Sequence, residues 1–214
     1  MAKKKLQRWE QLLTFPHVFQ YPEGMPGTWH EKVFKNDHPI VLELACGRGE
    51  YTVNLSEAYP EKNFIGVDIK GHRIWFGAKQ ALDEGRKNTA FLRTEIEKLD
   101  QYFAPEEVSE IWITFPDPQP QKTRERKRLT HPRFLDLYKK MLKPGGFIHL
   151  KTDNTQLYEF TLEITKEFSL PVVRHTDDLY KADFLDKYLS IKTTYEKIFT
   201  AKGEKIKYVQ FSLT

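Results

Sequence analysis

The chain has 214 residues, of which 30% are charged and 39% are hydrophobic. That length is typical of one large domain with an extension, and the composition excludes a disordered chain. No apolar run approaches the ~20 residues of a membrane span, and no apolar segment follows the basic N-terminus as in a secretory signal. The single cysteine, Cys46, excludes an intramolecular disulfide and a cysteine-based zinc cluster. We therefore expect a cytoplasmic enzyme or binding protein.

The net charge of +4 is unevenly distributed along the chain. Residues 1–9 carry +4 and residues 119–133 carry +5, so the remaining residues sum to −5. A mildly acidic body with two compact basic segments favours a polyanionic partner that engages one or both segments. The alternative is a solvated tail and a solvated face.

The pattern of the chain predicts alternating strands and helices. Residues 15–39 are rich in proline, glycine and aromatic residues and predict a loop-rich lead-in. Strands are predicted at 40–45, 63–69, 89–94, 110–115, 146–152 and 205–213, and helices at 50–59, 70–82, 132–142 and 155–168. We expect residues 1–39 to form a basic tail with this lead-in, and residues 40–214 to form a single domain.

Strands that alternate with helices of this length predict βαβ units and a mainly parallel sheet, which is the α/β fold class. In such a sheet, ligands bind beyond the carboxyl ends of the strands. That rule selects Glu43 to Gly49, Asp68, Thr94 and Glu95, Phe115 to Pro118, and Thr152 to Asn154.

The glycine turn after the first predicted strand points to a ligand without phosphate. Gly47 and Gly49 allow a sharp turn and a close approach to a ligand. Thr52 occupies the third glycine position of the dinucleotide fingerprint, and the Gly-Lys-Ser/Thr of a phosphate-binding loop is absent. Glu43 precedes the glycines, where its charge would repel a phosphate and would suit a cationic or hydrogen-bond-donating ligand.

The next two strand ends carry further carboxyl groups. Asp68 ends the second predicted strand, where it can accept hydrogen bonds from both ribose hydroxyls, and Glu95 ends the third. A nucleoside with a positive centre, S-adenosylmethionine, fits this set. The alternative is that the glycines form a plain tight turn and that Asp68 caps a helix.

Four later motifs are narrower than the glycine turn. They are Phe115-Pro116-Asp117-Pro118, the basic run ending Lys127-Arg128-Leu129-Thr130, Lys151-Thr152-Asp153-Asn154, and Thr193-Thr194-Tyr195-Glu196 followed by Lys202-Gly203. In these motifs the sequence resembles the bacterial tRNA (guanine-N7)-methyltransferases of the TrmB type, from about Gly27 to the C-terminus.

The resemblance implies a Rossmann-like class I methyltransferase fold with a mainly parallel seven-stranded sheet and an antiparallel C-terminal strand. It implies methyl transfer from S-adenosyl-L-methionine to N7 of a guanine in the variable loop of tRNA. The cofactor residues are expected to be Glu43, Gly47, Gly49, Asp68, Glu95 and Asp117. The substrate residues are expected to be Gln121, Lys122, Asp153, Thr193, Thr194, Tyr195 and Glu196, with Arg124, Arg126, Lys127 and Arg128 on the tRNA backbone.

The chain departs from the family pattern at several of these positions. Asp68 stands where the family commonly has Glu, and Glu95 where it has Asp, so both keep a carboxylate. Gln119 replaces a common Trp and Gln121 replaces a substrate-contacting Lys. Lys122 is then expected to supply that charge from one position further on.

Methylation of guanine N7 constrains the catalytic residues. N7 has a free lone pair and loses no proton, so no strong general base is needed. Holding the methyl donor and the guanine in line can by itself lower the activation barrier by ~7–11 kcal/mol. A carboxylate that accepts from N1–H and the exocyclic amine grips the base and favours its developing positive charge. Asp117, between Pro116 and Pro118 that fix its backbone, is the expected catalytic residue, and Asp153 is the second candidate. The alternatives are a solvated strand exit for Asp117 and a helix N-cap for Asp153.

The basic run over residues 122–133 is expected to neutralise tRNA phosphates, while the shape of the tRNA selects the guanosine that leaves its stack. Lys3 to Lys5 form either a second flexible contact or a disordered tail. We expect tRNA as partner, no membrane, no metal, and a monomer or homodimer.

Two other functions stay open. One is an S-adenosylmethionine-dependent amino-group methyltransferase on rRNA or protein, because Phe115-Pro116-Asp117-Pro118 loosely resembles its Asx-Pro-Pro-aromatic loop, although Asp117 and Pro118 do not fit. The other is a non-catalytic RNA-binding protein that kept the fold.

Overall fold

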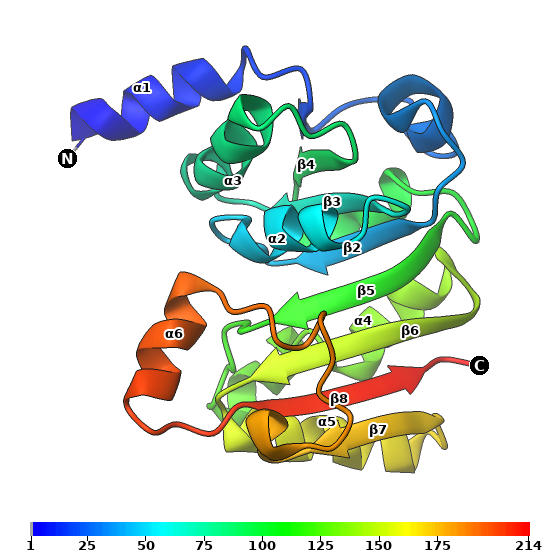
Figure 1. Cartoon of the computed structure of the whole chain (residues 1–214). Helices are drawn as coiled ribbons and strands as arrows, with labels where there is room; N and C mark the ends of the chain where they lie inside the picture. Colours follow the sequence, from blue (N-terminus) through cyan, green and yellow to red (C-terminus); the bar gives the residue numbers. More distant parts are fainter. Residues whose placement is uncertain (1) are drawn as a thin grey trace. The chain divides into compact units, whose positions relative to one another are not determined.

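The computed structural model describes residues 2–214, with side chains from residue 5 onward. The chain divides into two compact units, Met1–Ala104 and Pro105–Thr214. The methyltransferase domain that the sequence predicts for residues 40–214 extends over both units, and its boundary stays a prediction. Each unit combines strands and helices in the order expected of an α/β fold (Figure 1).

The first unit holds four parallel strands in the order β1-β4-β3-β2. The strands are β1 (Val18–Gln20), β2 (Ile40–Leu44), β3 (Asn63–Asp68) and β4 (Thr89–Arg93). The helices are α1 (Ala2–Leu12), α2 (Glu50–Ala58) and α3 (Gly71–Asp83), with a π-helical segment η1 (Trp29–Phe34) and a 3-10 segment η2 (Ile96–Gln101).

The register of these strands brings their carboxyl ends to one edge. Glu43 in β2 lies opposite Gly66 in β3, and Asp68 at the end of β3 lies opposite Arg93 at the end of β4. Every residue of β2 and β3 is buried, which explains why both read as nearly continuous apolar runs instead of alternating ones. The selected strand-end residues of the first unit, Glu43 to Gly49, Asp68, Thr94 and Glu95, therefore lie at this edge.

The glycine turn between β2 and α2 is closely packed on one side and open on the other. A Cβ on Gly49 (φ +68°) would lie 2.5 Å from the ring of Phe91, and one on Gly77 of α3 would lie 2.7 Å from the Arg48 carbonyl oxygen. A Cβ on Gly47 (φ +55°) would meet only the Ala45 carbonyl oxygen, at 3.9 Å. Packing therefore requires glycine at 49 and 77, while Gly47 leaves open space above the turn.

The second unit holds four strands in the order β5-β6-β8-β7. The strands are β5 (Val108–Thr114), β6 (Leu142–Thr152), β7 (Val172–Thr176) and β8 (Lys207–Ser212); β5 and β6 are parallel, and β8 is antiparallel to β6 and β7. The helices are α4 (Pro132–Lys139), α5 (Thr155–Glu167) and α6 (Thr194–Ala201), with 3-10 segments η3 (Lys122–Lys127) and η4 (Leu179–Lys181).

Local capping explains where the helices of this unit begin. Asn154 Oδ1 accepts from the backbone N–H of Leu157 at 2.8 Å and caps α5. The alternative that Asp153 caps this helix is therefore wrong. Pro132 stands in the first turn of α4, where its missing N–H leaves no hydrogen bond unmade.

The mainly parallel α/β fold with an antiparallel C-terminal strand is confirmed, but the described residues hold eight strands, where the family resemblance implies seven. The expected lead-in contains β1, a strand of three residues that is too short for a pattern and that forms by pairing with β4. Sequence analysis also missed β7, α6 and α1. The N-terminal segment expected to be flexible is the helix α1, and its Leu12 is fully buried.

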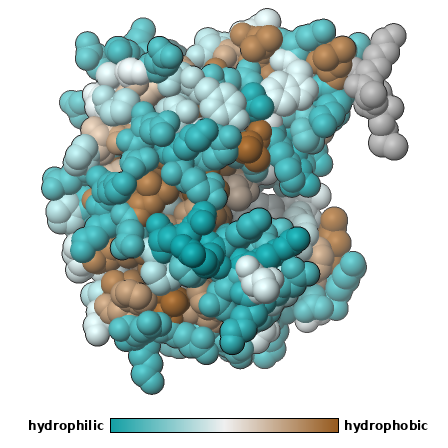
Figure 2. Space-filling view, turned by 180° about the vertical axis from the view of Figure 1, so that it is seen from behind, coloured by the Kyte–Doolittle hydropathy of each residue, from teal (hydrophilic) through white to brown (hydrophobic). Residues whose placement is uncertain are grey.

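The surface seen from behind is mainly hydrophilic, with apolar patches dispersed over it (Figure 2). None of the helices in the described part of the chain is long and apolar enough to cross a membrane.

The packing of the glycine turn predicts the effect of Gly49→Ala. The new methyl group overlaps the Phe91 ring, so we expect the free energy of unfolding to fall by about 1–3 kcal/mol more than in a matched control. The control is Gly85→Ala, which has a similar φ of +63° but no atom near its Cβ, so that it reports backbone strain alone, about 1–2 kcal/mol. Urea denaturation of the two variants measures the difference; equal losses would contradict the close packing.

Candidate active site

Glu43 joins the end of β2 to the start of α2. Its side chain is 4% exposed, and Oε2 accepts hydrogen bonds from the backbone N–H of Thr52, at 2.8 Å, and from the Thr52 hydroxyl. Thr52 lies in the first turn of α2, where backbone N–H groups have no partner inside the helix. The carboxylate therefore closes the glycine turn, a structural function that stands beside its predicted contact with a cofactor.

Asp68 joins the end of β3 to the same turn. Its Oδ2 accepts from the backbone N–H of Gly47 at 2.9 Å, and its Oδ1 accepts from that of Lys70 at 2.7 Å. Lys70, not Asp68, is the N-cap residue of α3, so the alternative of a helix-capping Asp68 is wrong. An ionised carboxylate has about four acceptor positions. Asp68 therefore keeps capacity for two ribose hydroxyls.

Glu95 follows β4 and precedes η2. Its half-buried carboxylate pairs with Lys98 Nζ at 3.1 Å. Hydrogen bonds from its own backbone N–H and from Lys98 lower the pKa of Glu95, which favours the ionised form. Glu43, Asp68 and Glu95 thus end three neighbouring strands within the first unit.

This edge of the first unit fits S-adenosylmethionine better than a phosphate-bearing cofactor. The N–H groups of Gly47 and Gly49 are bound to Asp68 Oδ2 and the Cys46 carbonyl oxygen, so neither points outward to a phosphate. The groups that line the edge are carboxyl oxygens, which accept from hydroxyls and attract a positive centre. Gly47 leaves space above the turn for the approach of a ligand.

In the second unit, a rigid loop presents Asp117. Phe115 and Gln119, both at φ +47°, bracket the loop, and Asp117 Oδ1 accepts from the backbone N–H of Gln119 at 3.1 Å. The Gln119 carbonyl oxygen accepts from Nε and Nη2 of Arg128, both at 3.3 Å. Asp117 itself is exposed. The fixed backbone on both sides holds its carboxylate toward solvent in one place.

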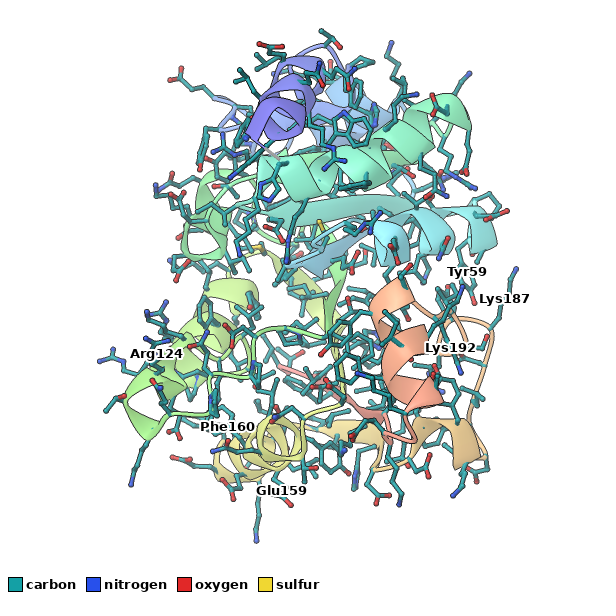
Figure 3. The ribbon with its side chains drawn as sticks, turned by 90° about the vertical axis from the view of Figure 1, so that its left-hand side faces the viewer. Tyr59, Arg124, Glu159, Phe160, Lys187 and Lys192 are labelled. Atoms are coloured by element: carbon teal, nitrogen blue, oxygen red, sulfur yellow. The ribbon has the colours of Figure 1, made fainter. Side chains whose placement is uncertain are left out.

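Arg128 is placed inside the protein. It is 2% exposed, pairs with Glu125 at 3.3 Å and lies 4.5 Å from the ring centroid of Phe160. With its nitrogens bound to the loop, the guanidinium is a positioning group for residues 117–119, in place of the tRNA contact expected from the sequence. The other predicted RNA contacts are exposed on or beside η3, where Figure 3 shows Arg124 projecting outward: Gln121, Lys122, Arg124, Arg126 and Lys127.

Asp153 and Tyr195 form an exposed acid–aromatic cluster after β6. The Tyr195 hydroxyl donates to Asp153 Oδ2 at 3.3 Å. The Tyr195 ring stacks on Phe199 at 4.2 Å and lies 5.4 Å from the ring of Phe115. Burial and the Asp153 carboxylate raise the pKa of Tyr195, so that its hydroxyl stays a donor. The cluster combines an aromatic ring with a carboxylate whose oxygens are hydrogen-bond acceptors.

The other residues of the 193–196 motif have separate functions. Thr193 Oγ1 accepts from the backbone N–H of Glu196 at 3.1 Å and caps α6. Glu196 is fully buried, where it pairs with Lys151 Nζ at 2.9 Å and accepts from the Tyr180 hydroxyl. Thr194 is exposed. Within this motif, Thr193 and Glu196 therefore hold α6 in place, while Thr194 and Tyr195 face outward.

Sequence analysis did not predict that Lys151 is a buried structural residue. Besides Glu196, it donates to the carbonyl oxygens of Leu189 at 3.0 Å and Ile191 at 2.8 Å. Burial lowers the pKa of Lys151, and the Glu196 carboxylate opposes that shift. The available signal was the position of this lysine directly after the mainly apolar stretch of residues 147–150, since a buried lysine requires polar partners.

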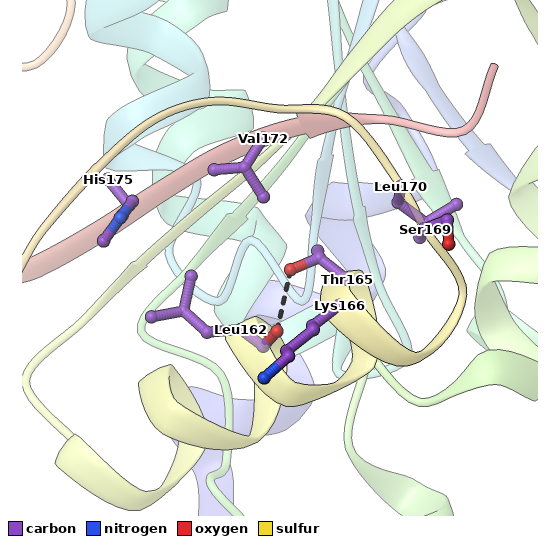
Figure 4. Close-up of a pocket in the computed structure, with 7 residues that line it drawn as sticks. All are labelled: Leu162, Thr165, Lys166, Ser169, Leu170, Val172 and His175. Carbon is purple, nitrogen blue, oxygen red and sulfur yellow. Dashed lines mark hydrogen bonds between the residues drawn. The ribbon is translucent and has the colours of Figure 1, made fainter.

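A cavity of about 480 Å³ lies elsewhere in the second unit, between α5 and the segment that leads into β7 (Figure 4). Its lining includes Leu162, Thr165, Val172 and His175, and the Thr165 hydroxyl donates to the Leu162 carbonyl oxygen at 2.9 Å. None of the predicted site residues lines it. Across residues 2–214, no group of three or more His, Cys, Asp or Glu side chains could hold a metal ion.

Comparison with known proteins also indicates a methyltransferase. A family model described as a putative methyltransferase matches residues 37–209. The crystal structure of a SAM-dependent methyltransferase from Aquifex aeolicus superimposes with a TM-score of 0.56 at 14% identity, over 100% of this chain and 93% of that one. The fold is therefore that of a methyltransferase.

Relatives in sequence define the family. A tRNA (guanine-N(7)-)-methyltransferase of Bacteroides thetaiotaomicron is 51% identical over 100% of this chain and 87% of its own length. One of Porphyromonas gingivalis is 56% identical over 94% of this chain and 86% of its own length. The chain belongs to the tRNA (guanine-N7)-methyltransferase family, which confirms the resemblance seen in its motifs.

The opposite environments of two neighbouring arginines predict opposite mutational effects. Arg128→Ala leaves the partly buried Gln119 carbonyl oxygen without its two guanidinium donors, so we expect a loss of about 1–3 kcal/mol in the free energy of unfolding. Arg126→Ala, at an exposed position of the same segment, serves as the matched control and changes it by no more than about 0.5 kcal/mol. Urea denaturation checks both; a neutral Arg128→Ala would contradict the positioning function.

Proposed function

We propose that the protein transfers a methyl group from S-adenosyl-L-methionine to N7 of a guanine in the variable loop of tRNA. The observation that carries the proposal is that a chain of this family holds carboxyl groups at the ends of β2, β3 and β4 and a rigidly presented Asp117 after β5. The partner is tRNA, and the protein acts in the cytoplasm.

The residues of the first unit hold the cofactor. When bound, S-adenosylmethionine supplies a methyl group on a positively charged sulfur. Asp68 accepts hydrogen bonds from its ribose hydroxyls, Gly47 leaves room for its approach, and Glu95 adds a further carboxyl group at the same edge. Glu43 keeps the turn in shape from inside the protein. The negative edge favours a cationic ligand over a phosphate.

The residues of the second unit position the guanine. N7 carries its own lone pair and releases no proton, so none of these residues has to act as a strong base. Asp117 and Asp153 are exposed or half-exposed carboxyl groups that accept from guanine N1–H and the exocyclic amine and stabilise the positive charge of the methylated base. Tyr195 offers a stacking surface beside Asp153.

The exposed side chains of η3 bind the RNA backbone. Lys122, Arg124, Arg126 and Lys127 project from one short segment, and Arg128 secures its end inside the protein. Such contacts add affinity that depends on salt and little on sequence, so the shape of the tRNA selects the guanosine.

The proposal is tested with labelled cofactor and unmodified tRNA. Digestion of the product and nucleoside mass spectrometry should give N7-methylguanosine. A methylated amino group in place of it would favour the amino-group methyltransferases, and the same assay on rRNA identifies their substrate. Binding of tRNA with no cofactor affinity by calorimetry would favour a non-catalytic RNA-binding protein.

Asp117→Asn isolates the charge at the catalytic position. Asparagine keeps an oxygen for the hydrogen bond from the Gln119 N–H, so the loop should keep its shape. We expect kcat to fall by about 10²–10³-fold, because the developing positive charge on guanine loses its stabilisation. The control is Asp136→Asn, an exposed aspartate of α4. Single-turnover rates measure the effect, and an unchanged rate would remove Asp117 from the catalytic site.

The η3 segment predicts the salt dependence of RNA binding. Removing three phosphate contacts with Arg124→Ala, Arg126→Ala and Lys127→Ala should reduce the slope of log affinity against log salt by about 2–3. Cofactor affinity should stay unchanged. A triple variant of exposed lysines in the same unit, Lys139→Ala, Lys143→Ala and Lys166→Ala, is the control. Filter binding at several potassium chloride concentrations decides; identical slopes would mean that the segment is a solvated face.

A further inference from the structure

Helix α1 is packed over the start of α3 and is a fixed part of the first unit (Figure 1). A Cβ at Gly71, the first residue of α3, would lie 3.1 Å from both Trp9 and Leu12 of α1. Trp75 Nε1 donates to Gln11 Oε1 at 2.9 Å. The basic N-terminal segment is thus held against the element that follows Asp68.

The cations of α1 face those at the start of α3. Lys5 and Arg8 precede Trp9 by four residues and one residue, which puts Lys5 on the helix face that packs on α3. The first turn of α3 contributes Arg73, and Lys70 precedes it. Burial lowers the pKa of His72, and the positive charges of Lys5, Arg73 and Lys70 add to that shift while the Asp68 carboxylate opposes it. Charges from both elements therefore act on this side chain.

Two arginines extend this field toward the glycine turn. The Arg8 guanidinium lies 4.3 Å from the ring centroid of Phe76 and 5.0 Å from that of Trp75. The Arg48 guanidinium lies 3.9 Å from the same Phe76 ring. Stacking on aromatic rings restricts both guanidinium groups while leaving N–H donors at their edges. We call Lys5, Arg8, Arg48, Lys70 and Arg73 the α1–α3 basic surface.

The neighbouring acids do not neutralise this surface. Asp68 is 8% exposed, and its two oxygens accept from backbone N–H groups. Glu50 pairs with Arg48 at 3.6 Å and offsets its charge in part. Lys5, Lys70 and Arg73 are exposed, and within the described part of the chain they form no ion pair. The N-terminal end of α3 adds a further partial positive charge.

We propose that the α1–α3 basic surface binds the phosphodiester backbone of the tRNA, as a second contact carried by the first unit and separate in sequence from η3. The assignment of the polyanion as tRNA rests on the proposed function. Several exposed cations from two helices and a turn match the repeated phosphates of a nucleic acid strand better than a single small anion.

An anionic membrane is the rival partner, because Leu6 of α1 and Leu13 directly after it are exposed, at 61% and 75%. A helix that lies in a membrane needs a continuous apolar face. The apolar face of α1, with Trp9 and Leu12, is used against α3. Two separate leucines remain, while Lys5, Lys70 and Arg73 form no ion pair within the described residues, so the surface fits RNA.

The test reverses charge at two exposed positions, Lys5→Glu with Arg73→Glu. The matched control is Lys32→Glu with Lys87→Glu, two exposed lysines of the same unit, one in η1 and one beyond the far end of α3. Binding of unmodified tRNA is measured by filter binding across potassium chloride concentrations. We expect at least tenfold weaker binding at low salt and a salt slope reduced by about 1–2 relative to the control. Cofactor affinity by calorimetry and the melting temperature should match the control.

The proposal is overturned if the variant and its control bind tRNA with equal affinity and slope. It is also overturned if tRNA binding is equal while the Lys5→Glu and Arg73→Glu variant alone stops co-sedimenting with phosphatidylglycerol vesicles. Unchanged tRNA binding in the charge-conserving variant, Lys5→Arg with Arg73→Lys, supports the proposal.

Formation of N7-methylguanosine by the unmodified protein is measured in parallel. If that product forms while variant and control bind alike, the surface proposal fails and the proposed function stands. If the product is absent while the charge-reversed variant still loses tRNA affinity, the proposal that the α1–α3 basic surface binds tRNA stands and the proposed methylation is wrong.

Discussion

The buried carboxylate of Glu43 is the interaction on which the arrangement of the first unit depends. It accepts both the backbone N–H and the hydroxyl of Thr52, and so ties the end of β2 to the first turn of α2 across the glycine turn. Asp68 ties the same turn to the end of β3. Because acids inside the fold bind the turn, its amides do not point outward as in a phosphate-binding loop, and the edge is left rich in acceptors.

In the second unit, buried cations hold the loop and helix in place, as buried carboxylates do in the first unit. Arg128 secures the loop around Asp117 through the Gln119 carbonyl oxygen, and Lys151 secures α6 through Glu196. Each buried cation has several oxygen partners, which offset the cost of removing it from water. The exposed carboxyl group of Asp117 is thereby held on a fixed loop. Pre-organisation of this kind suits a reaction that needs orientation more than proton transfer.

Periodicity located most elements, because buried strands and amphipathic helices leave a pattern in the order of residues. The short β1 and the exposed β7 left none, since both depend on a neighbouring strand that is distant in the sequence. The candidate site was found in part for the same reason. The rule for parallel strands selected Glu43, Asp68 and Glu95 by position alone, whereas burial separated Arg128 from Arg126 and Glu196 from Tyr195.

The sequence by itself determined the α/β class, the strand ends that carry carboxyl groups and the family motifs, because each is written in residues close together in the chain. Only the tertiary structure decided which charged side chains are buried in the fold and which face solvent. A lysine, arginine or glutamate looks the same in a sequence whether it is buried or exposed, and its environment comes from residues far away in the chain. The helical N-terminus was decided in the same way, by the packing of Trp9 and Leu12 on Gly71.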